Sequence, residues 1–230
     1  MQPSQNAKYI HALRFRWLTP LYDAVVGLST RERTFKKALI QQAAFQSGQK
    51  VLDLGCGTGT LSIWIKQMYP KIEVVGLDGD PEILKLARRK SHQADASIQF
   101  DEGFSTRLPY PENHFDRIVS TLFFHHLTLS DKQRTIAEVL RVLKPGGQLH
   151  VADWGKASNA LMRGLFFFIQ ILDSFETTRD NIQGRLPQLF EKAGFIEVSC
   201  VRTFSTAFGT IAFYKASKPD LVRARGRSHA

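Results

Sequence analysis

Cysteine is scarce in this 230-residue chain, which has only two. Cys56 lies in a glycine-rich stretch and Cys200 lies near the C-terminal end. Two cysteines so placed exclude a disulfide framework and have no spacing typical of metal ligands. We therefore expect a protein without a metal site that resides in the reducing cytoplasm.

Long apolar runs are also missing. The longest apolar stretch, LFFFIQIL at residues 165–172, is far shorter than the roughly 20 residues that cross a bilayer. Charged residues interrupt the segment Met1–Pro20, which therefore lacks the apolar core of a secretory signal. We expect a soluble or peripheral protein.

Acidic residues are too few to balance the basic ones, and the net charge is +10. Residues 1–50 hold eight Lys and Arg against two acidic residues, and residues 215–230 hold five against one, so the middle is neutral. A protein that grips nucleic acid usually spreads basic side chains over a folded face, so we do not expect such a partner. The basic ends form a solvated arm and tail, or alternatively contact an anionic membrane surface.

Three glycines follow an apolar run at residues 51–54, in the sequence VLDLGCGTGT. Because Gly55, Gly57 and Gly59 lack Cβ atoms, a ligand can approach the backbone where a strand passes into a helix. Asp78 ends the next apolar run, where a carboxylate can accept hydrogen bonds from a ribose. The third glycine comes one residue earlier than in the dinucleotide fingerprint, which favours a nucleoside ligand without a pyrophosphate.

Four ordered motifs resemble those of class I S-adenosylmethionine-dependent methyltransferases. They occupy residues 51–60, 74–78, 108–116 and 138–147. The resemblance implies S-adenosylmethionine as the cofactor and an α/β fold of Rossmann-like type. Its seven-stranded sheet is expected to be mostly parallel, with helices on both faces and the last strand antiparallel.

We expect one domain over residues 1–230, and the sequence leaves its oligomeric state open. The expected parts are an N-terminal helical arm (1–48), a cofactor-binding core (49–153), a helical acceptor-site insert (154–193), closing strands (194–215) and a disordered basic tail (216–230). Strands are expected at 50–54, 72–77, 97–100, 116–121, 148–153, 195–202 and 208–215. Helices are expected at 32–45, 59–68, 81–91, 131–142, 157–175 and 181–193.

Local signals mark some of these boundaries. Asp80 can cap a helix that has Pro81 in its first position. Ser130 and Gln133 have the spacing of a capping box. The sequence Lys-Pro-Gly-Gly at residues 144–147 predicts a turn.

By resemblance, the cofactor contacts fall at the ends of successive strands. They are Asp53, Gly55, Cys56, Gly57, Thr58, Gly59, Asp78, Gly79, Gly103, Phe104, Ser105 and Thr121. One position departs from the family, because Phe104-Ser105 replaces the Asp-Ala or Asn-Ala expected beside adenine. Phe104 could stack on the adenine ring while Ser105 or nearby backbone supplies the hydrogen bond, with Asp101 and Glu102 as alternatives.

Methyl transfer requires alignment, and a base where the acceptor must lose a proton. His125 and His126, after the fourth strand, and Asp153, at the end of the fifth, are the candidates. The alternative is that the histidine pair is a packing feature and that catalysis rests on alignment alone.

Aromatic side chains outside the cofactor core point to a small apolar or aromatic acceptor, which is quinone-, phenol- or lipid-like. The candidate acceptor-binding residues are Tyr9, Phe15, Trp17, Tyr22, Trp154 and Phe167. The arm is similar to that of quinone-biosynthesis C-methyltransferases and some phospholipid N-methyltransferases. An RNA methyltransferase and a catalytically silent cofactor-binding module remain alternatives, although the chain has no Asn/Asp-Pro-Pro-Tyr/Phe tetrapeptide after the fourth strand.

Overall fold

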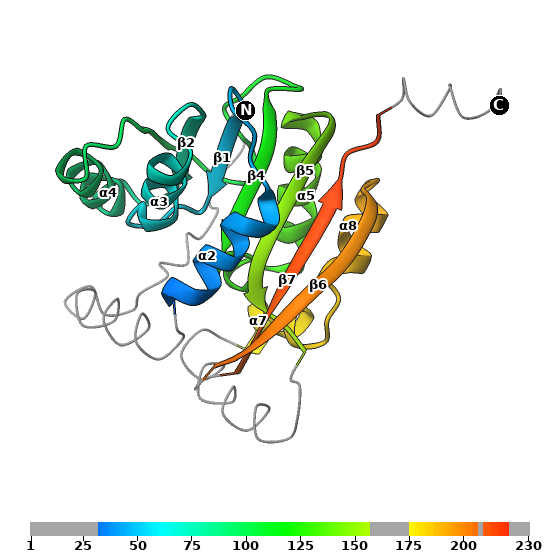
Figure 1. Cartoon of the computed structure of the whole chain (residues 1–230). Coiled ribbons are helices and arrows are strands. Elements are labelled where there is room, and N and C mark those ends of the chain that lie inside the picture. Colours follow the sequence, from blue (N-terminus) through cyan, green and yellow to red (C-terminus); the bar gives the residue numbers. More distant parts are fainter. Residues whose placement is uncertain (1–31, 157–174, 207–208, 221–230) are drawn as a thin grey trace, which may run out of the picture.

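The computed structural model describes residues 32–156, 175–206 and 209–220, and seven of its strands form one sheet in the order β3-β2-β1-β4-β5-β7-β6 (Figure 1). Strands β1 to β5 are parallel, whereas β7 is antiparallel to both of its neighbours. This arrangement confirms the expected fold class. The strands are β1 (Lys50–Leu54), β2 (Glu73–Asp78), β3 (Gln99–Glu102), β4 (Phe115–Thr121), β5 (Leu143–Trp154), β6 (Ile196–Thr206) and β7 (Gly209–Ser217).

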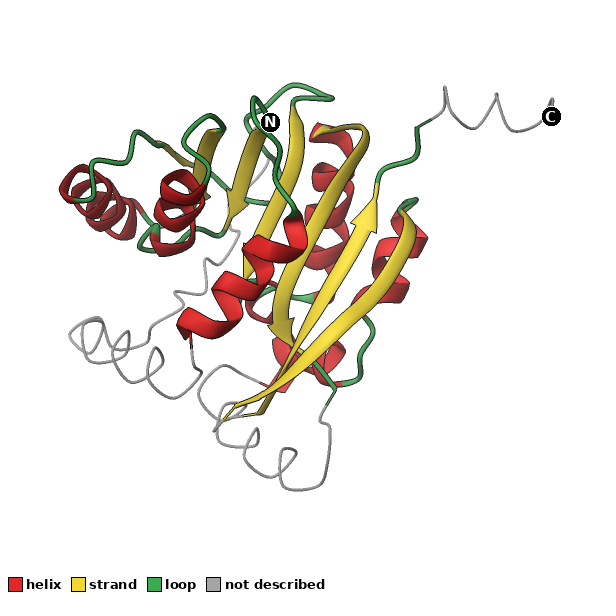
Figure 2. Ribbon diagram, in the orientation of Figure 1, coloured by secondary structure: helices red, strands yellow, loops and turns green. Residues whose placement is uncertain are grey.

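Helices cover both faces of the sheet (Figure 2). They are α2 (Glu32–Ala43), α3 (Thr60–Met68), α4 (Pro81–Gln93), the 3-10 turn η2 (Phe124–His126), α5 (Leu129–Val142), α7 (Phe175–Ile182) and α8 (Leu186–Ala193). On one face α2 crosses β4 and β5, and on the other α5 packs against α8. The crossovers between parallel strands place helices on both faces, as doubly wound sheets require.

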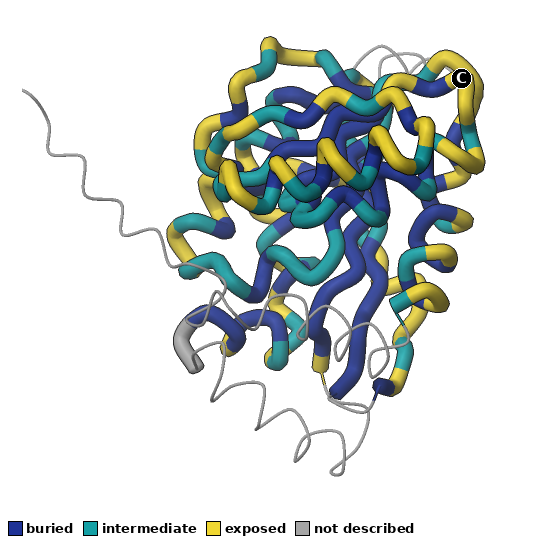
Figure 3. Tube along the Cα trace, turned by 90° about the vertical axis from the view of Figure 1, so that its left-hand side faces the viewer, coloured by how far each residue is buried: buried dark blue, intermediate teal, exposed yellow. Residues whose placement is uncertain are grey.

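Alternating side chains of the strands feed two separate cores. Val51 of β1 packs with α2 and α3 on one face, whereas Leu52 and Leu54 pack with α5 and α8 on the other. The central strands are therefore buried, while the outer turns of the helices are exposed (Figure 3). Because successive strand residues point to opposite faces, near-continuous apolar runs are needed here.

Two helix starts test the local signals. Asp80 caps α4, and its carboxylate accepts the main-chain N–H groups of Glu82 and Ile83, as expected. The predicted capping box at Ser130 and Gln133 is wrong, because α5 begins at Leu129 and is capped by Thr128. The Thr128 hydroxyl accepts the main-chain N–H of Asp131, so Ser130 already lies inside the helix.

Three other expectations need correction. The predicted turn at residues 144–147 lies within β5, which accommodates Gly146 at a φ of 73° next to a break in register with β4. The predicted helix 181–193 is two helices, because Gly184 with a φ of 69° separates α7 from α8. Strand β3 begins two residues later than expected, at Gln99. The helix predicted at 157–175 lies almost entirely outside the described residues.

Candidate active site

Aromatic side chains pack against both ends of the glycine loop between β1 and α3, whereas no described atom packs against its middle. Gly55, Gly57 and Gly59 have φ values of 70°, 52° and 74°, in the region that glycine adopts without strain. A Cβ at Gly55 would lie 2.3 Å from the ring of Phe123, and one at Gly59 would lie 2.9 Å from Phe100. A Cβ at Gly57 would meet no atom within 4 Å, so a ligand can reach the backbone there.

Asp78 ends β2 beside this loop and holds it. One carboxylate oxygen accepts the main-chain N–H of Gly57 at 2.9 Å, and the other accepts that of Asp80 at 3.1 Å. Burial raises the pKa of Asp78, and these backbone donors oppose the rise. The side chain is only partly buried. The predicted contact Gly79 follows it directly.

Asp53 lies in the apolar run 51–54 that precedes the glycine loop, and it is completely buried at the end of β1. Oδ2 accepts the hydroxyl of Ser62 at 2.6 Å, whereas Oδ1 has no hydrogen-bond partner among the described residues. Burial raises the pKa of this carboxyl to about 6. A buried acceptor left without a donor suits the cationic amino group of an amino-acid-like ligand.

A lysine that the sequence did not single out holds the far side of the loop. Lys90 of α4 donates from Nζ to the hydroxyls of Thr58 and Thr60, at 2.9 and 2.7 Å. Ser62 was missed in the same way. The position of Ser62 in the first turn of the helix that follows the loop is the one signal in the sequence that could have indicated its role. Lys90 has no such local signal. Cys56, another predicted contact, is buried against Phe100 and Leu84.

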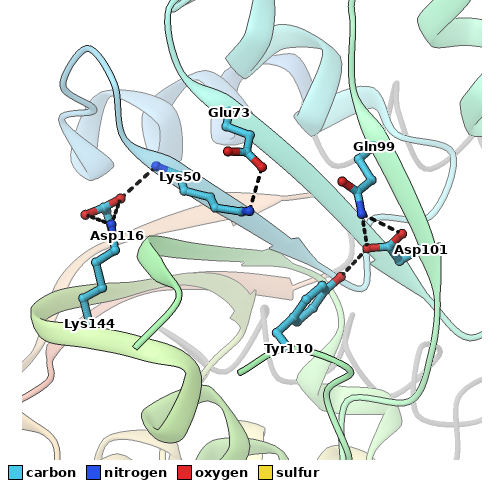
Figure 4. Close-up of polar contacts among 7 residues, drawn as sticks. All are labelled: Lys50, Glu73, Gln99, Asp101, Tyr110, Asp116 and Lys144. Atoms are coloured by element: carbon cyan, nitrogen blue, oxygen red, sulfur yellow. Dashed lines mark hydrogen bonds and ion pairs between the residues drawn. The ribbon is translucent and has the colours of Figure 1, made fainter. Parts of the chain in front are cut away.

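The loop after β3 shows what the departing motif does. Phe104 is 58% exposed. Ser105 is buried and its hydroxyl lies 2.8 Å from that of Thr135, which occupies the group expected to meet adenine. Asp101, the alternative candidate for the adenine contact, accepts hydrogen bonds from Tyr110 Oη and Gln99 Nε2 (Figure 4). Gly103 donates its N–H to the carbonyl of Asp78 and so holds this loop beside β2.

Asp153 is also completely buried, at the end of β5, and four donors surround it. Oδ2 accepts the N–H groups of Phe123 and Phe124 at 3.0 and 2.7 Å. Oδ1 lies 2.7 Å from His125 Nδ1 and accepts the N–H of Trp154 at 2.7 Å. Burial alone would raise the pKa of Asp153, but His125 and the backbone donors bring it below its ordinary value.

The two histidines of η2 stand in different positions. His125 is buried and held by Asp153, and its ring lies 3.9 Å, centroid to centroid, from that of His126. Burial and the neighbouring His125 lower the pKa of His126 to about 3. Leu122, which leads into η2, has a φ of 50°, a strained conformation for a branched residue at this edge.

The remaining predicted residues divide into two groups. Thr121 pairs with Ala152 in the ladder, and Trp154 is buried against Phe213 and Ile211 with its ring edge-on to His125 at 6.3 Å. Five predicted acceptor-binding residues lie outside the described residues, namely Tyr9, Phe15, Trp17, Tyr22 and Phe167. In the described part of the chain, no group of three His, Cys, Asp or Glu side chains could hold a metal ion. Of the helices described, none is long and apolar enough to cross a membrane.

Comparison with known proteins decides the family. A family model described as a methyltransferase domain matches residues 51–147. The demethylmenaquinone methyltransferase of Listeria monocytogenes is 30% identical over 86% of this chain and 91% of that protein. The ubiquinone/menaquinone biosynthesis C-methyltransferase UbiE of Shewanella halifaxensis is 31% identical over 81% of this chain and 80% of that protein. The chain belongs to the class I S-adenosylmethionine-dependent methyltransferases.

Solved structures agree with this fold. A methyltransferase from Aquifex aeolicus superposes with a TM-score of 0.66 at 19% identity, covering 88% of this chain and 97% of that one. A phosphoethanolamine N-methyltransferase 2 from Haemonchus contortus, in complex with S-adenosylhomocysteine, has a TM-score of 0.70 at 18% identity and covers 86% of this chain and 56% of that one. The present protein belongs to the same class, and its cofactor is S-adenosylmethionine.

Proposed function

We propose that this methyltransferase acts on a small aromatic acceptor of quinone or phenol type, with His125 as the general base. The observation that carries the proposal is the buried His125–Asp153 pair, at 2.7 Å, at the edge of the sheet where the strands β4 and β5 end. Ligands of open α/β sheets bind outside this edge. Two relatives are named as methyltransferases of menaquinone or ubiquinone synthesis, which supports an acceptor of that class.

The geometry favours His125 over its neighbour. Because Asp153 is ionised, it accepts the Nδ1 proton of His125, and this leaves Nε2 as the basic atom of the ring. A carboxylate in contact also stabilises the imidazolium that forms when an acceptor hydroxyl gives up its proton. The pKa of His126, about 3, makes that ring too weak a base at neutral pH.

Other residues hold the methyl donor. When bound, S-adenosylmethionine supplies an electrophilic methyl group on a positively charged sulfur. Asp53 would accept a hydrogen bond from the amino group of the cofactor, and Asp78 would accept hydrogen bonds from its ribose hydroxyls. The glycine loop and Phe123, packed at Gly55, then fix the distance between donor and acceptor. Such alignment can supply much of the rate enhancement.

The first experiment identifies the acceptor class. The protein is incubated with methyl-labelled S-adenosylmethionine and a cell extract, and the products are divided into an organic extract, RNA and protein. We expect label in the organic extract, in aromatic products. Label in RNA would support the alternative of an RNA methyltransferase, and label in none of the three would support a silent cofactor-binding module.

The second experiment tests the base. Replacing His125 by Asn should lower the single-turnover rate by about 10²- to 10⁴-fold and remove a limb of the pH–rate profile, with cofactor affinity preserved. The matched change at His126 should cost less than about tenfold, since a ring with a pKa of about 3 is a weak base. Equal, small losses at both positions would show that the pair is structural.

A further inference from the structure

Helix α7 turns an unusually polar face toward the interior. Thr177, Thr178, Asp180 and Asn181 are all buried, at most 5% exposed. The helix packs against η2 and against β5, and in Figure 1 it lies at the end of the sheet where β5 terminates. A face of this kind must find hydrogen-bond partners, because burying a polar group without one is costly.

Most of this face has partners. Lys132 of α5, which is fully buried, donates from Nζ to the carbonyl oxygen of Thr177 at 2.6 Å and lies 3.5 Å from Asp180. Arg185 approaches the other carboxylate oxygen of Asp180 at 3.6 Å. Thr177 and Thr178 take part in further contacts. These interactions leave Asn181 as the member of the face still to be explained.

Asn181 has no such partner. Its side chain is 0% exposed, and within the described residues neither its amide oxygen nor its amide nitrogen has a hydrogen-bond partner. Asp53 Oδ1 is another buried oxygen in this state, and it belongs to the cofactor site. A buried amide with both ends unpaired destabilises the fold, and proteins retain groups of that kind where a ligand completes them.

We propose that Asn181 binds the acceptor through its amide, an inference that rests on the proposed function. Nδ2 donates a hydrogen bond to an oxygen of the acceptor, and Oδ1 accepts a hydrogen bond from a hydroxyl of the acceptor, so the amide matches a ring that carries a neutral hydroxyl or a hydroxyl beside a carbonyl. An ammonium group only donates and a phosphate only accepts, so either would leave half of the amide unpaired. The amide therefore fits the hydroxylated aromatic ring of the proposed function better than an isolated ammonium or phosphate group.

The test compares two naphthalene probes, 1,4-dihydroxynaphthalene, which has two hydrogen-bond donors, and 1,4-dimethoxynaphthalene, which has two methyl groups in their place and no donor. Binding of each is measured anaerobically by calorimetry, with S-adenosylhomocysteine present. The wild type should prefer the dihydroxy probe by about tenfold or more, and Asn181→Leu should abolish that preference. Gln183→Leu is the matched control. Gln183 is exposed and lies two residues after Asn181, so this variant should keep the preference for the dihydroxy probe.

A second readout separates binding from structure. Without ligand, Asn181→Leu should raise Tm by about 2–4 °C, because an unpaired buried amide is removed, whereas Gln183→Leu should leave Tm unchanged. If the leucine variant does not fold, Asn181→Ala, which needs no extra space, replaces it in the binding comparison. A lower Tm together with an intact preference would overturn the inference and make Asn181 a structural residue.

The outcomes also separate this inference from the proposed function. A wild type that methylates aromatic acceptors but binds both probes equally would overturn the role of Asn181 alone. A wild type that binds neither probe, while S-adenosylhomocysteine still binds, would overturn the acceptor class and the inference with it. A preference that depends on Asn181 would stand even if His125 proved not to be the base.

Discussion

Two carboxylates, Asp53 and Asp153, occupy equivalent places and behave in opposite ways. Each is completely buried at the carboxyl end of a parallel strand, β1 and β5. Burial raises the pKa of Asp53 to about 6, whereas Asp153 has a pKa below the ordinary value. The difference lies in the donors, because Ser62 serves one oxygen of Asp53 while four donors serve both oxygens of Asp153.

The comparison shows that depth of burial alone does not decide the pKa of a carboxylate, because the charge and hydrogen bond of His125, together with the backbone donors, lower that of Asp153. Asp153 is already satisfied within the protein, so it anchors η2 and orients His125. Asp53 has one oxygen without a donor among the described residues, and we propose that the cofactor supplies that donor when it binds.

The largest effect is expected from Asp153→Ala. The change leaves three main-chain N–H groups and His125 without their acceptor, so the free energy of unfolding should fall by about 3–5 kcal/mol. Urea unfolding measures it. Glu82→Ala, which breaks the exposed pair with Lys85, is the control and should cost less than about 1 kcal/mol. A loss at Asp153 no larger than that of the control would contradict the anchoring role.

Asp53→Asn should raise the free energy of unfolding, in contrast to Asp153→Ala. A carboxyl whose pKa is raised to about 6 is ionised at pH 7.5 at a cost, so the neutral amide should raise the free energy of unfolding of the ligand-free protein by about 1–3 kcal/mol. Affinity for S-adenosylmethionine should fall by about tenfold or more, because the charge-assisted contact is lost. Calorimetry and urea unfolding measure the two changes. A less stable variant would show that Asp53 serves the fold.

The pH dependence of stability should separate Asp53 from His150. Burial lowers the pKa of His150, which contacts Gln42 and Gln148, to about 3. The unfolded chain binds that proton first, so stability rises with pH between about 3 and 6.5. For Asp53 the folded protein binds the proton more tightly, so stability falls as pH rises from about 4 to 6.

In that window Asp53→Asn should therefore steepen the rise of stability with pH, and His150→Gln should flatten it. His126, with a pKa of about 3, adds to the rise in both variants. Urea unfolding at pH 4.5, 5.5 and 6.5 measures the slopes. Parallel slopes for the wild type and both variants would refute the assigned pKa directions.

The smallest effect is expected from Lys90→Met, which keeps the aliphatic chain but removes the ammonium group that bridges Thr58 and Thr60. The bridge is only partly buried, so stability should change by less than about 1 kcal/mol. Affinity for S-adenosylmethionine should fall by about threefold to tenfold, since the loop loses a fixed conformation. Unchanged affinity would show that Asp78 alone holds the loop.

The sequence predicted those parts of the fold and site that depend on local signals. The glycine loop, Asp78 and the cap at Asp80 follow from residues close together in the chain, and the structure places them as the strand order requires. The cap of α5 was missed because Thr128, Ser130 and Gln133 compete, and only the extended backbone of Thr128 decides between them.

What could not be predicted depends on contacts between distant segments. Three of the four donors around Asp153 come from Phe123, Phe124 and His125, about thirty residues earlier, and Lys90 reaches the loop from α4. The polar face of α7 becomes informative only when burial and partners are known, because a Thr-Thr-Arg-Asp-Asn sequence also suits an exposed helix. The assignment of cofactor-binding, catalytic and substrate-binding residues stays a prediction.

The contact between Gly55 and Phe123 limits how this enzyme can be redesigned. The ring fills the space of a side chain at residue 55, so the glycine loop and the segment that leads into η2 pack directly on each other. Enlarging residue 55 would push η2 away, and shrinking Phe123 would leave a void behind the loop. A substitution at residue 123 therefore also changes the packing of the glycine loop, and a library that varies one position should vary the other with it.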